Sequence, residues 1–276
     1  MNICSNTKFL FIVTSSGKVE DRFLYDVELF IKIIKSKGVN VSNVIVATDV
    51  QESAVLAKCP DMQGAMFISS SQLLQTINVI DCDNLIILAD CHGSIHGIDA
   101  QSPIMPHPLT ESIKNNSALK NTIVFFGQCY AGIYNWVDLR QDDMNIVYLG
   151  ATGCDSSLSY GVSGIPWSAN ISLVAFGQWL LNPIDVDGDG LFTVMDLYKY
   201  ISCFTNSITD EIEKKQTADL VDAKVELKLA MKDQGNLTDM MMQLEREAVE
   251  ALGSYIVPHQ VPWLLNAFSA QKIQFE

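Results

Sequence analysis

Two apolar runs rich in β-branched and aromatic residues, 85–89 and 122–126, each stop abruptly at a polar segment that contains glycine. The segment after the first run holds His92, and the segment after the second run holds Cys129. If the two runs are neighbouring parallel strands, their carboxyl ends lie side by side, at the edge where open α/β sheets build their binding sites. The sequence therefore predicts an imidazole beside a thiol at one edge of a sheet.

This pair of side chains suits nucleophilic catalysis. A thiolate is the reactive form of cysteine, and a nearby histidine can activate it and then donate a proton to the leaving group. A single cysteine after a strand is usually a small buried hydrophobe. Packing alone does not explain why Cys129 and His92 both stand at strand ends and are both followed by glycine, so we expect a catalytic dyad.

The rest of the chain alternates between strand-like and helix-like segments, a pattern that indicates a mostly parallel sheet covered by helices on both faces. Further strands are expected at 9–13, 44–47 and 146–150, with a closing strand at 272–275. Helices are expected at 21–37, 71–77, 109–114 and 166–181, and residues 49–64 are polar and irregular. The expected fold class is α/β, with an αβα sandwich.

The two strand ends resemble those of the caspase and legumain group of cysteine peptidases, in which one strand ends in His-Gly and another ends near the nucleophilic cysteine. The similarity extends over roughly residues 8 to 165. Two departures surround the cysteine: Gln128 directly precedes it, and Gly132 follows one place late. The residues that carry the likeness are Ser16, Gly17 and Arg22, then His92, Gly93 and Ser94, then Gln128 and Cys129, and finally Ser156, Ser157 and Tyr160.

The resemblance implies a caspase-like αβα fold and a cysteine endopeptidase that cleaves a protein or peptide and needs no cofactor for its chemistry. In that reading Cys129 is the nucleophile and His92 is its acid–base partner. The backbone amides of Gly93 and Cys129 would form the oxyanion hole, because glycine lets the backbone approach the substrate carbonyl. The serine-rich loop with Ser156 and Ser157 would contribute to substrate binding.

The resemblance also implies that Arg22 and Gln128 frame the pocket for the residue before the cut. A guanidinium beside a neutral amide favours a carboxylate, since arginine can bind it with two hydrogen bonds. Asp before the cut is the first expectation, and Asn is the second. Two alternatives stay open: Arg22 can form a surface ion pair with Asp21 or Glu20, and a basic preference would point to Asp90 or Asp155.

A calcium-type loop spans residues 185–196. Aspartates occupy its first, third and fifth positions, a glycine occupies the sixth, and a carboxylate occupies the twelfth, as in the EF-hand template. The expected calcium ligands are Asp185, Asp187, Asp189, Leu191, Thr193 and Asp196. An Asp-Gly turn that caps the following helix is the alternative. Because the chain holds a single such loop, we expect a structural ion rather than a paired calcium sensor.

Residues 207–253 contain two apolar stripes at helical spacing, separated by Gly235-Asn236. They predict a helical hairpin inserted into the peptidase domain, which would comprise residues 1–206 and 254–276. Packing of the hairpin on the domain is the simpler expectation. The alternative is a surface for a regulatory partner, because Met240-Met241-Met242 offers an adaptable apolar face.

Charge and composition narrow the partners. The net charge of −14 argues against nucleic acid and anionic membranes, both of which need clustered Lys and Arg. No stretch approaches the ~18 apolar residues of a membrane span. The seven cysteines lack a CxxC spacing, and the N-terminus lacks the features of a signal peptide, so we expect a reduced, cytoplasmic protein.

Two further functions stay possible from the residues alone. One is a cysteine amidohydrolase of the glutaminase kind, which would use Cys129 with His259. The other is a non-catalytic interaction protein on a peptidase fold.

Overall fold

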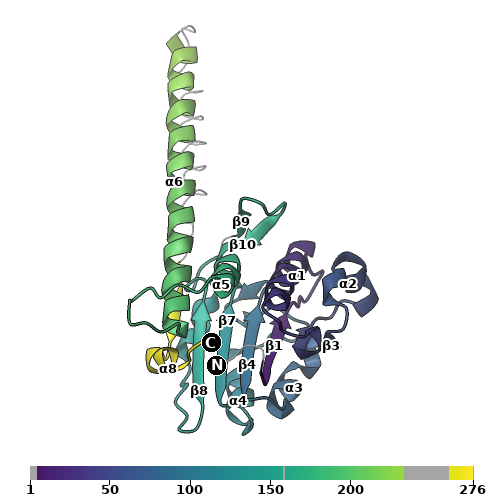
Figure 1. Cartoon of the computed structure of the whole chain (residues 1–276). Helices are drawn as coiled ribbons and strands as arrows, with labels where there is room; N and C mark the ends of the chain where they lie inside the picture. The colour runs from purple at the N-terminus through teal and green to yellow at the C-terminus, as the bar shows by residue number, and fades with distance from the viewer. Residues whose placement is uncertain (1–4, 158, 233–260, 276) are drawn as a thin grey trace.

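The computed structural model describes residues 5–157, 159–232 and 261–275, and all structural statements below concern these residues. Its centre is a seven-stranded sheet in the order β11-β8-β7-β4-β1-β2-β3, with helices on both faces (Figure 1). All neighbouring strands in it are parallel except β11, which runs antiparallel to β8. The expected α/β class with an αβα sandwich and a mostly parallel sheet is therefore confirmed.

The sheet strands are β1 (Thr7–Ile12), β2 (Val44–Ala47), β3 (Met66–Ile68), β4 (Asn84–Ala89), β7 (Asn121–Phe126), β8 (Asn145–Gly150) and β11 (Trp263–Leu265). Two small antiparallel pairs stand outside it: β5 (Gly93–Ser94) with β6 (Gly97–Ile98), and β9 (Ser159–Gly161) with β10 (Ser168–Asn170). The helices are α1 (Asp21–Ser36), α2 (Glu52–Lys58), α3 (Leu73–Val79), α4 (Pro106–Lys114), α5 (Ile171–Leu181), α6 (Val194–Lys232) and α8 (Ala267–Lys272).

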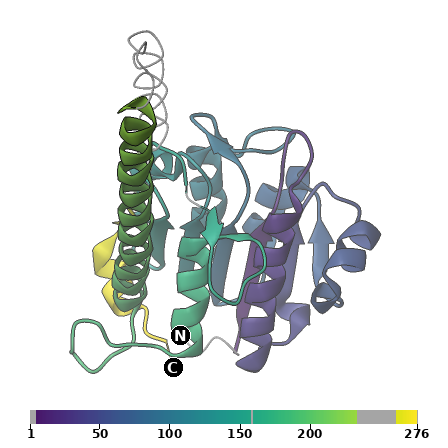
Figure 2. The ribbon, with the colours of Figure 1, turned by 90° about the horizontal axis from the view of Figure 1, so that it is seen from above.

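Two apolar cores lie on opposite faces of the sheet. Successive side chains of a strand point to opposite faces, so Phe9 and Phe11 of β1 join one core while Leu10 and Ile12 join the other. The first core lies under α1 and α5, which run side by side over the sheet (Figure 2). The second core lies under α3 and α4. Burial on both faces explains why these strands are continuous apolar runs rather than alternating ones.

A ladder of polar side chains joins four neighbouring strands at their amino ends. The Asn145 amide donates to Asn121, the Asn121 amide donates to Asn84, and the Asn84 amide donates to the Thr7 hydroxyl, over 3.0, 2.8 and 3.2 Å. Each of these residues begins its strand. Because a one-residue slip would break the ladder and turn the apolar side chains to the wrong face, the ladder helps to hold the register of the central sheet.

Three expected elements differ in the structure. Residues 49–64 are not irregular, because they contain α2, whose single buried side chain, Val55, is too little to create a helical pattern in the sequence. The helix expected from residue 166 begins only at Ile171, where the Asn170 side chain accepts a hydrogen bond from the Leu173 N–H and caps it. The closing strand is Trp263–Leu265 rather than 272–275.

The expected hairpin is only partly within reach of the structure. Its first arm is not a separate helix, because α6 is continuous over 39 residues from Val194 to Lys232. Val194, Leu197 and Ile201 are buried in the first core, and the remainder of α6 extends away from the sheet (Figure 1). The second arm falls on residues 233–253, outside the described residues, so the 207–253 insertion and its partner surface stay predictions.

Candidate active site

The register of the sheet puts His92 and Cys129 at equivalent places on neighbouring strands. β4 and β7 pair up to Ala89 and Phe126, and the two residues each follow three positions later. The segments then touch: a Cβ at Gly93 would collide with the Cys129 carbonyl oxygen and with the side chain of Gln128. Glycine is therefore needed here for the close approach. The structure brings these two segments together, as the sequence led us to expect.

Cys129 presents an accessible thiol beside the His92 segment, and the exposed Cys154 lies on the loop after β8. The Cys129 side chain is partly exposed, and its Sγ atom accepts a hydrogen bond from the Ser157 N–H at 3.3 Å. The neighbouring thiol of Cys91 is buried in the second core, and burial raises its pKa. A nucleophile has to ionise and reach solvent, so Cys129 rather than Cys91 has the environment of a reactive cysteine.

The chain turns sharply after the cysteine. Tyr130 has a φ of 56°, in the left-handed region that few non-glycine residues adopt. Its N–H donates to the Asp155 carbonyl oxygen at 2.8 Å. The N–H of Gly132 donates to the Gly153 carbonyl oxygen at 2.9 Å. A Cβ at Gly132 would collide with the Gly153 backbone, which explains why glycine stands at this later place. The loop after β8 is thus fastened to the turn that presents Cys129.

His92 is held by a residue that the sequence did not single out as part of the site. Its Nε2 atom lies 2.7 Å from Oε1 of Glu20, and its ring meets the ring of Phe23 edge to face, with centroids 5.1 Å apart. Hydrogen bonds from Arg22 and, to a smaller extent, from His92 lower the pKa of Glu20, so the carboxylate stays ionised. Glu20 was recognised from sequence only as an alternative partner for Arg22, because nothing local links it to a histidine 72 residues away.

Arg22 forms that alternative ion pair, and it also contacts the loop next to the cysteine. Its Nε atom donates to Oε2 of Glu20 at 2.6 Å, and Nη1 donates to the Ser159 hydroxyl at 2.5 Å. Its guanidinium lies 4.1 Å from the centre of the Phe23 ring. Asp21, the other partner considered, pairs with Lys58 instead. Arg22 therefore contacts Ser159, two residues after the Ser157 whose N–H reaches Cys129.

A pair of buried acids lies beneath the strand ends. Asp90 and Asp26 are 1 % and 3 % exposed, and the pKa of each is raised by burial, with the nearby Asp26 charge adding to the rise at Asp90. Two like charges at this depth cannot both ionise cheaply, so we infer that the pair shares a proton. Asp26 accepts hydrogen bonds from the Trp167 indole N–H at 2.6 Å and from the Asn170 N–H at 2.9 Å.

Asn170 connects this pair to the cysteine strand. Its side-chain amide donates to Oδ1 of Asp90 at 3.1 Å and to the carbonyl oxygen of Gly127 at 2.9 Å. The Asp90 oxygen Oδ2 has no hydrogen-bond partner apart from the shared proton inferred above. The arrangement binds the end of β4 to the end of β7 from below.

Other expected site residues have different surroundings. Gln128 is 1 % exposed, and neither amide atom has a hydrogen-bond partner among the described residues. Its place in a substrate pocket stays a prediction. The Ser156 N–H donates to the carboxylate of Asp155 at 2.7 Å. The exposed His96 lies in the turn between β5 and β6. His259, the base of the amidohydrolase alternative, lies outside the described residues.

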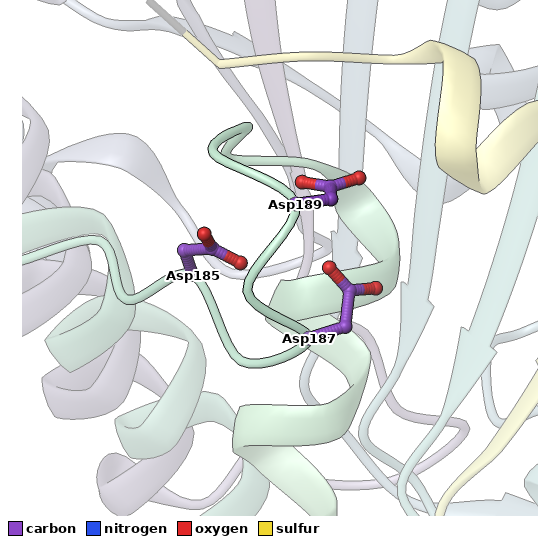
Figure 3. Close-up of side chains that lie close together, drawn as sticks. All are labelled: Asp185, Asp187 and Asp189. Carbon is purple, nitrogen blue, oxygen red and sulfur yellow. The ribbon is translucent and has the colours of Figure 1, made fainter.

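The loop at 185–196 gathers three of the predicted calcium ligands. One carboxylate oxygen from each of Asp185, Asp187 and Asp189 lies within 4.8 Å of the others (Figure 3). Lys199 binds Asp187 at 2.6 Å. Such a cluster of carboxylate oxygens on a glycine-containing loop fits a hard cation.

The fourth carboxylate of the loop has a different task. Asp196 is fully buried, and it accepts hydrogen bonds from the N–H groups of Val186 and Thr193 and from the Thr193 hydroxyl. Burial acts to raise its pKa, but the hydrogen bonds outweigh burial and lower it. Asp196 thereby closes the loop and caps α6. Leu191 and Thr193 use their N–H groups for Asp189 and Asp196 within the loop.

Comparisons with known proteins find only distant similarities. No family model and no curated protein sequence matches the chain. Among solved structures, caspase-1 from Spodoptera frugiperda is similar at TM-score 0.46 and 13 % identity, over 99 % of this chain and 89 % of that one. The structure titled drICE is similar at TM-score 0.42 and 11 % identity, over 74 % and 83 % of the two chains.

A third similar structure is a secreted C11 cysteine protease from Bacteroides thetaiotaomicron, at TM-score 0.39 and 10 % identity, over 72 % of this chain and 62 % of that one. Because all three scores are below 0.5, we base the assignment of function on the residues of this chain alone. Within the described part of the chain, the helices are too short or too polar to span a bilayer.

The buried acid pair predicts how stability depends on pH. The raised pKa of Asp90 means that its contribution to stability is present below its unfolded pKa and is lost as the pH rises through its folded pKa. Asp90→Asn imitates the protonated acid, because the new amide can donate to Asp26. We expect this variant to melt at a higher temperature than the wild type at pH 8, with the difference shrinking toward pH 4.5 in thermal unfolding followed by circular dichroism.

Asp26→Asn is the matched comparison. Both oxygens of Asp26 accept N–H donors, so an amide nitrogen would face one of these donors and the variant should melt lower at every pH. A wild-type advantage over Asp90→Asn that grows with pH would contradict the shared proton.

Proposed function

We propose that the chain is a cysteine endopeptidase that cleaves protein substrates after an acidic residue, with Asp preferred and Asn second. Cys129 attacks the scissile carbonyl, and His92 takes the thiol proton and returns it to the leaving amine. The observation that carries the proposal is the pairing of an accessible thiol with a histidine-bearing segment at equivalent ends of β4 and β7, packed so closely that only glycine fits between them.

Glu20 supports this assignment of His92. The carboxylate binds Nε2, which leaves Nδ1 as the ring nitrogen for exchange with the thiol. The same carboxylate faces the ring that receives the thiol proton in this step. The Ser157 N–H donates to Sγ, the atom that makes the attack. We assign the oxyanion hole to the backbone amides of Gly93 and Cys129, as the resemblance to caspases and legumains suggests.

The preference for an acidic residue before the cut follows from Arg22. Its guanidinium donates to Glu20 and to Ser159. Ser159 comes two residues after Ser157, whose N–H contacts Cys129. A substrate carboxylate at that place would gain a charge-assisted hydrogen bond, whereas an apolar or basic side chain would not.

Replacing the nucleophile tests the central assignment. Cys129→Ala should abolish cleavage of fluorogenic peptides and labelling by a thiol-reactive peptide probe, because it removes the assigned nucleophile. His92→Ala should lower turnover by a factor of at least ~100. Cys203→Ala is the matched control, since Cys203 is exposed on α6 and should leave both signals intact. Full peptide cleavage by the Cys129 variant would overturn the proposal.

Arg22 predicts selectivity. Arg22→Ala should lower the ratio of cleavage after Asp to cleavage after Leu at least tenfold in a peptide series that varies only the residue before the cut. Arg140→Ala is the control, because Arg140 is exposed and pairs with Asp138, so its loss should leave the ratio unchanged. Iodoacetamide should still alkylate Cys129 in the Arg22 variant. A wild-type preference for Lys or Arg would contradict the acid-binding pocket and turn attention to Asp155, since Asp90 is only 1 % exposed.

We further propose that the 185–189 carboxylates bind a calcium ion that stabilises the start of α6 and takes no part in the chemistry. The support is the convergence of three carboxylates on the glycine-containing loop that leads into α6. Asp196 already closes this loop from the buried side, so the ion would hold the exposed side.

Calcium should therefore raise the melting temperature, because a ligand that binds only the folded state stabilises it by mass action. Replacing both Asp187 and Asp189 with Ala should cancel the gain. The same double replacement at the exposed Asp142 and Asp143 removes equal charge elsewhere and should leave the gain unchanged. Absence of a heat of binding at millimolar calcium in titration calorimetry would leave the loop as a turn.

A further inference from the structure

A cavity of about 400 Å³ opens at the carboxyl ends of β1 and β2. Neither His92 nor Cys129 lines it. Its walls come from the segment after β1, from α2 and from the loop after β6, and they include Ser15, Ser16, Lys18, Ala54, Lys58 and Gln101. Peptide and small-molecule sites commonly have volumes of this size, on the order of 300–1,000 Å³.

The wall of the cavity is continuous with the support of His92. The carboxylate of Asp99 accepts hydrogen bonds from the Ser15 hydroxyl and the Ser16 N–H, over 3.0 and 3.1 Å. The backbone N–H of Asp99 donates to the His92 carbonyl oxygen at 2.9 Å. Glu20, which binds the imidazole, lies between two residues that line the cavity, Val19 and Asp21. Asp99 therefore links the wall of the cavity to the backbone of His92.

The order of the strands shows on which side of His92 the cavity lies. Along the sheet the sequence is β8, β7, β4, β1 and β2, so the 151–157 loop comes first, then Cys129, then His92, and then the cavity. In cysteine and serine hydrolysis the histidine protonates the leaving amine, so the leaving group departs on the imidazole side. The part of a substrate that follows the scissile bond therefore points toward this cavity.

We infer that this cavity binds the residues on the carboxyl side of the scissile bond. The inference rests on the proposed endopeptidase function. Lys58 is paired with Asp21 at 2.6 Å, so that pair offers no free charge. Asp49, also in the wall, accepts a hydrogen bond from the Ser70 N–H.

The inference distinguishes an endopeptidase from an amidohydrolase by the leaving group that each one releases. An amidohydrolase that releases ammonia has no use for a cavity on this side, whereas an endopeptidase releases a polypeptide that has to lie somewhere. Two substrates with the same residues before the cut measure the difference. One ends in an aminocoumarin amide, and the other continues for four residues to a quencher.

The test is the ratio of kcat/KM for the extended substrate to kcat/KM for the coumarin amide. Ala54→Trp fills the cavity from α2, and we expect this ratio to fall at least tenfold. Ala57→Trp places the same side chain on the same helix at an exposed position that does not line the cavity, and it should keep the ratio within twofold.

Each outcome of this test either supports or overturns the cavity assignment. An unchanged ratio in Ala54→Trp, or an equal fall in both tryptophan variants, overturns the cavity assignment and leaves the peptidase proposal standing. Failure of the wild type to cleave either substrate overturns both.

Discussion

The candidate site depends on one buried side chain, that of Asn170. Its amide N–H groups bind Asp90 at the end of β4 and Gly127 at the end of β7, and its carbonyl oxygen caps α5 through Leu173. Its backbone N–H binds Asp26 on α1. Four elements from distant parts of the chain are thus joined by one residue that is 3 % exposed. A buried polar network is stabilising only when its members are satisfied, and this one is completed by the proton that we place between the two acids.

The charges around His92 form a balanced set. Glu20 binds both Arg22 and His92, so one carboxylate links the guanidinium to the imidazole. The acids below contribute one negative charge rather than two if they share a proton. The site can therefore place a cation and an imidazole close together without a large excess of either sign, although the chain as a whole carries a net charge of −14.

Much of the fold followed from local patterns, because apolar runs and helix stops are local. β2 coincides with the predicted residues 44–47, and α1 ends one residue before the predicted helix does. The placement of His92 and Cys129 after neighbouring strand ends was also accessible from sequence, since each follows an apolar run. Glu20, Asp26 and Asn170 were not, because their roles come from contacts 72, 144 and 80 residues away in the sequence. The helix α2 was missed for a different reason: it buries too few side chains to produce a helical pattern in the sequence.

The asparagine ladder at the amino ends of the strands has a consequence for how related chains can differ in length. With the register set at that end, one residue inserted within β4 or β7 would move His92 past Cys129 by about 3.3 Å and turn it to the other face of the sheet. The six-residue lengths of these two strands are therefore coupled to each other. Insertions and deletions among relatives with the same chemistry should fall in the connections before Asn84 and Asn121, and spare the two strands themselves.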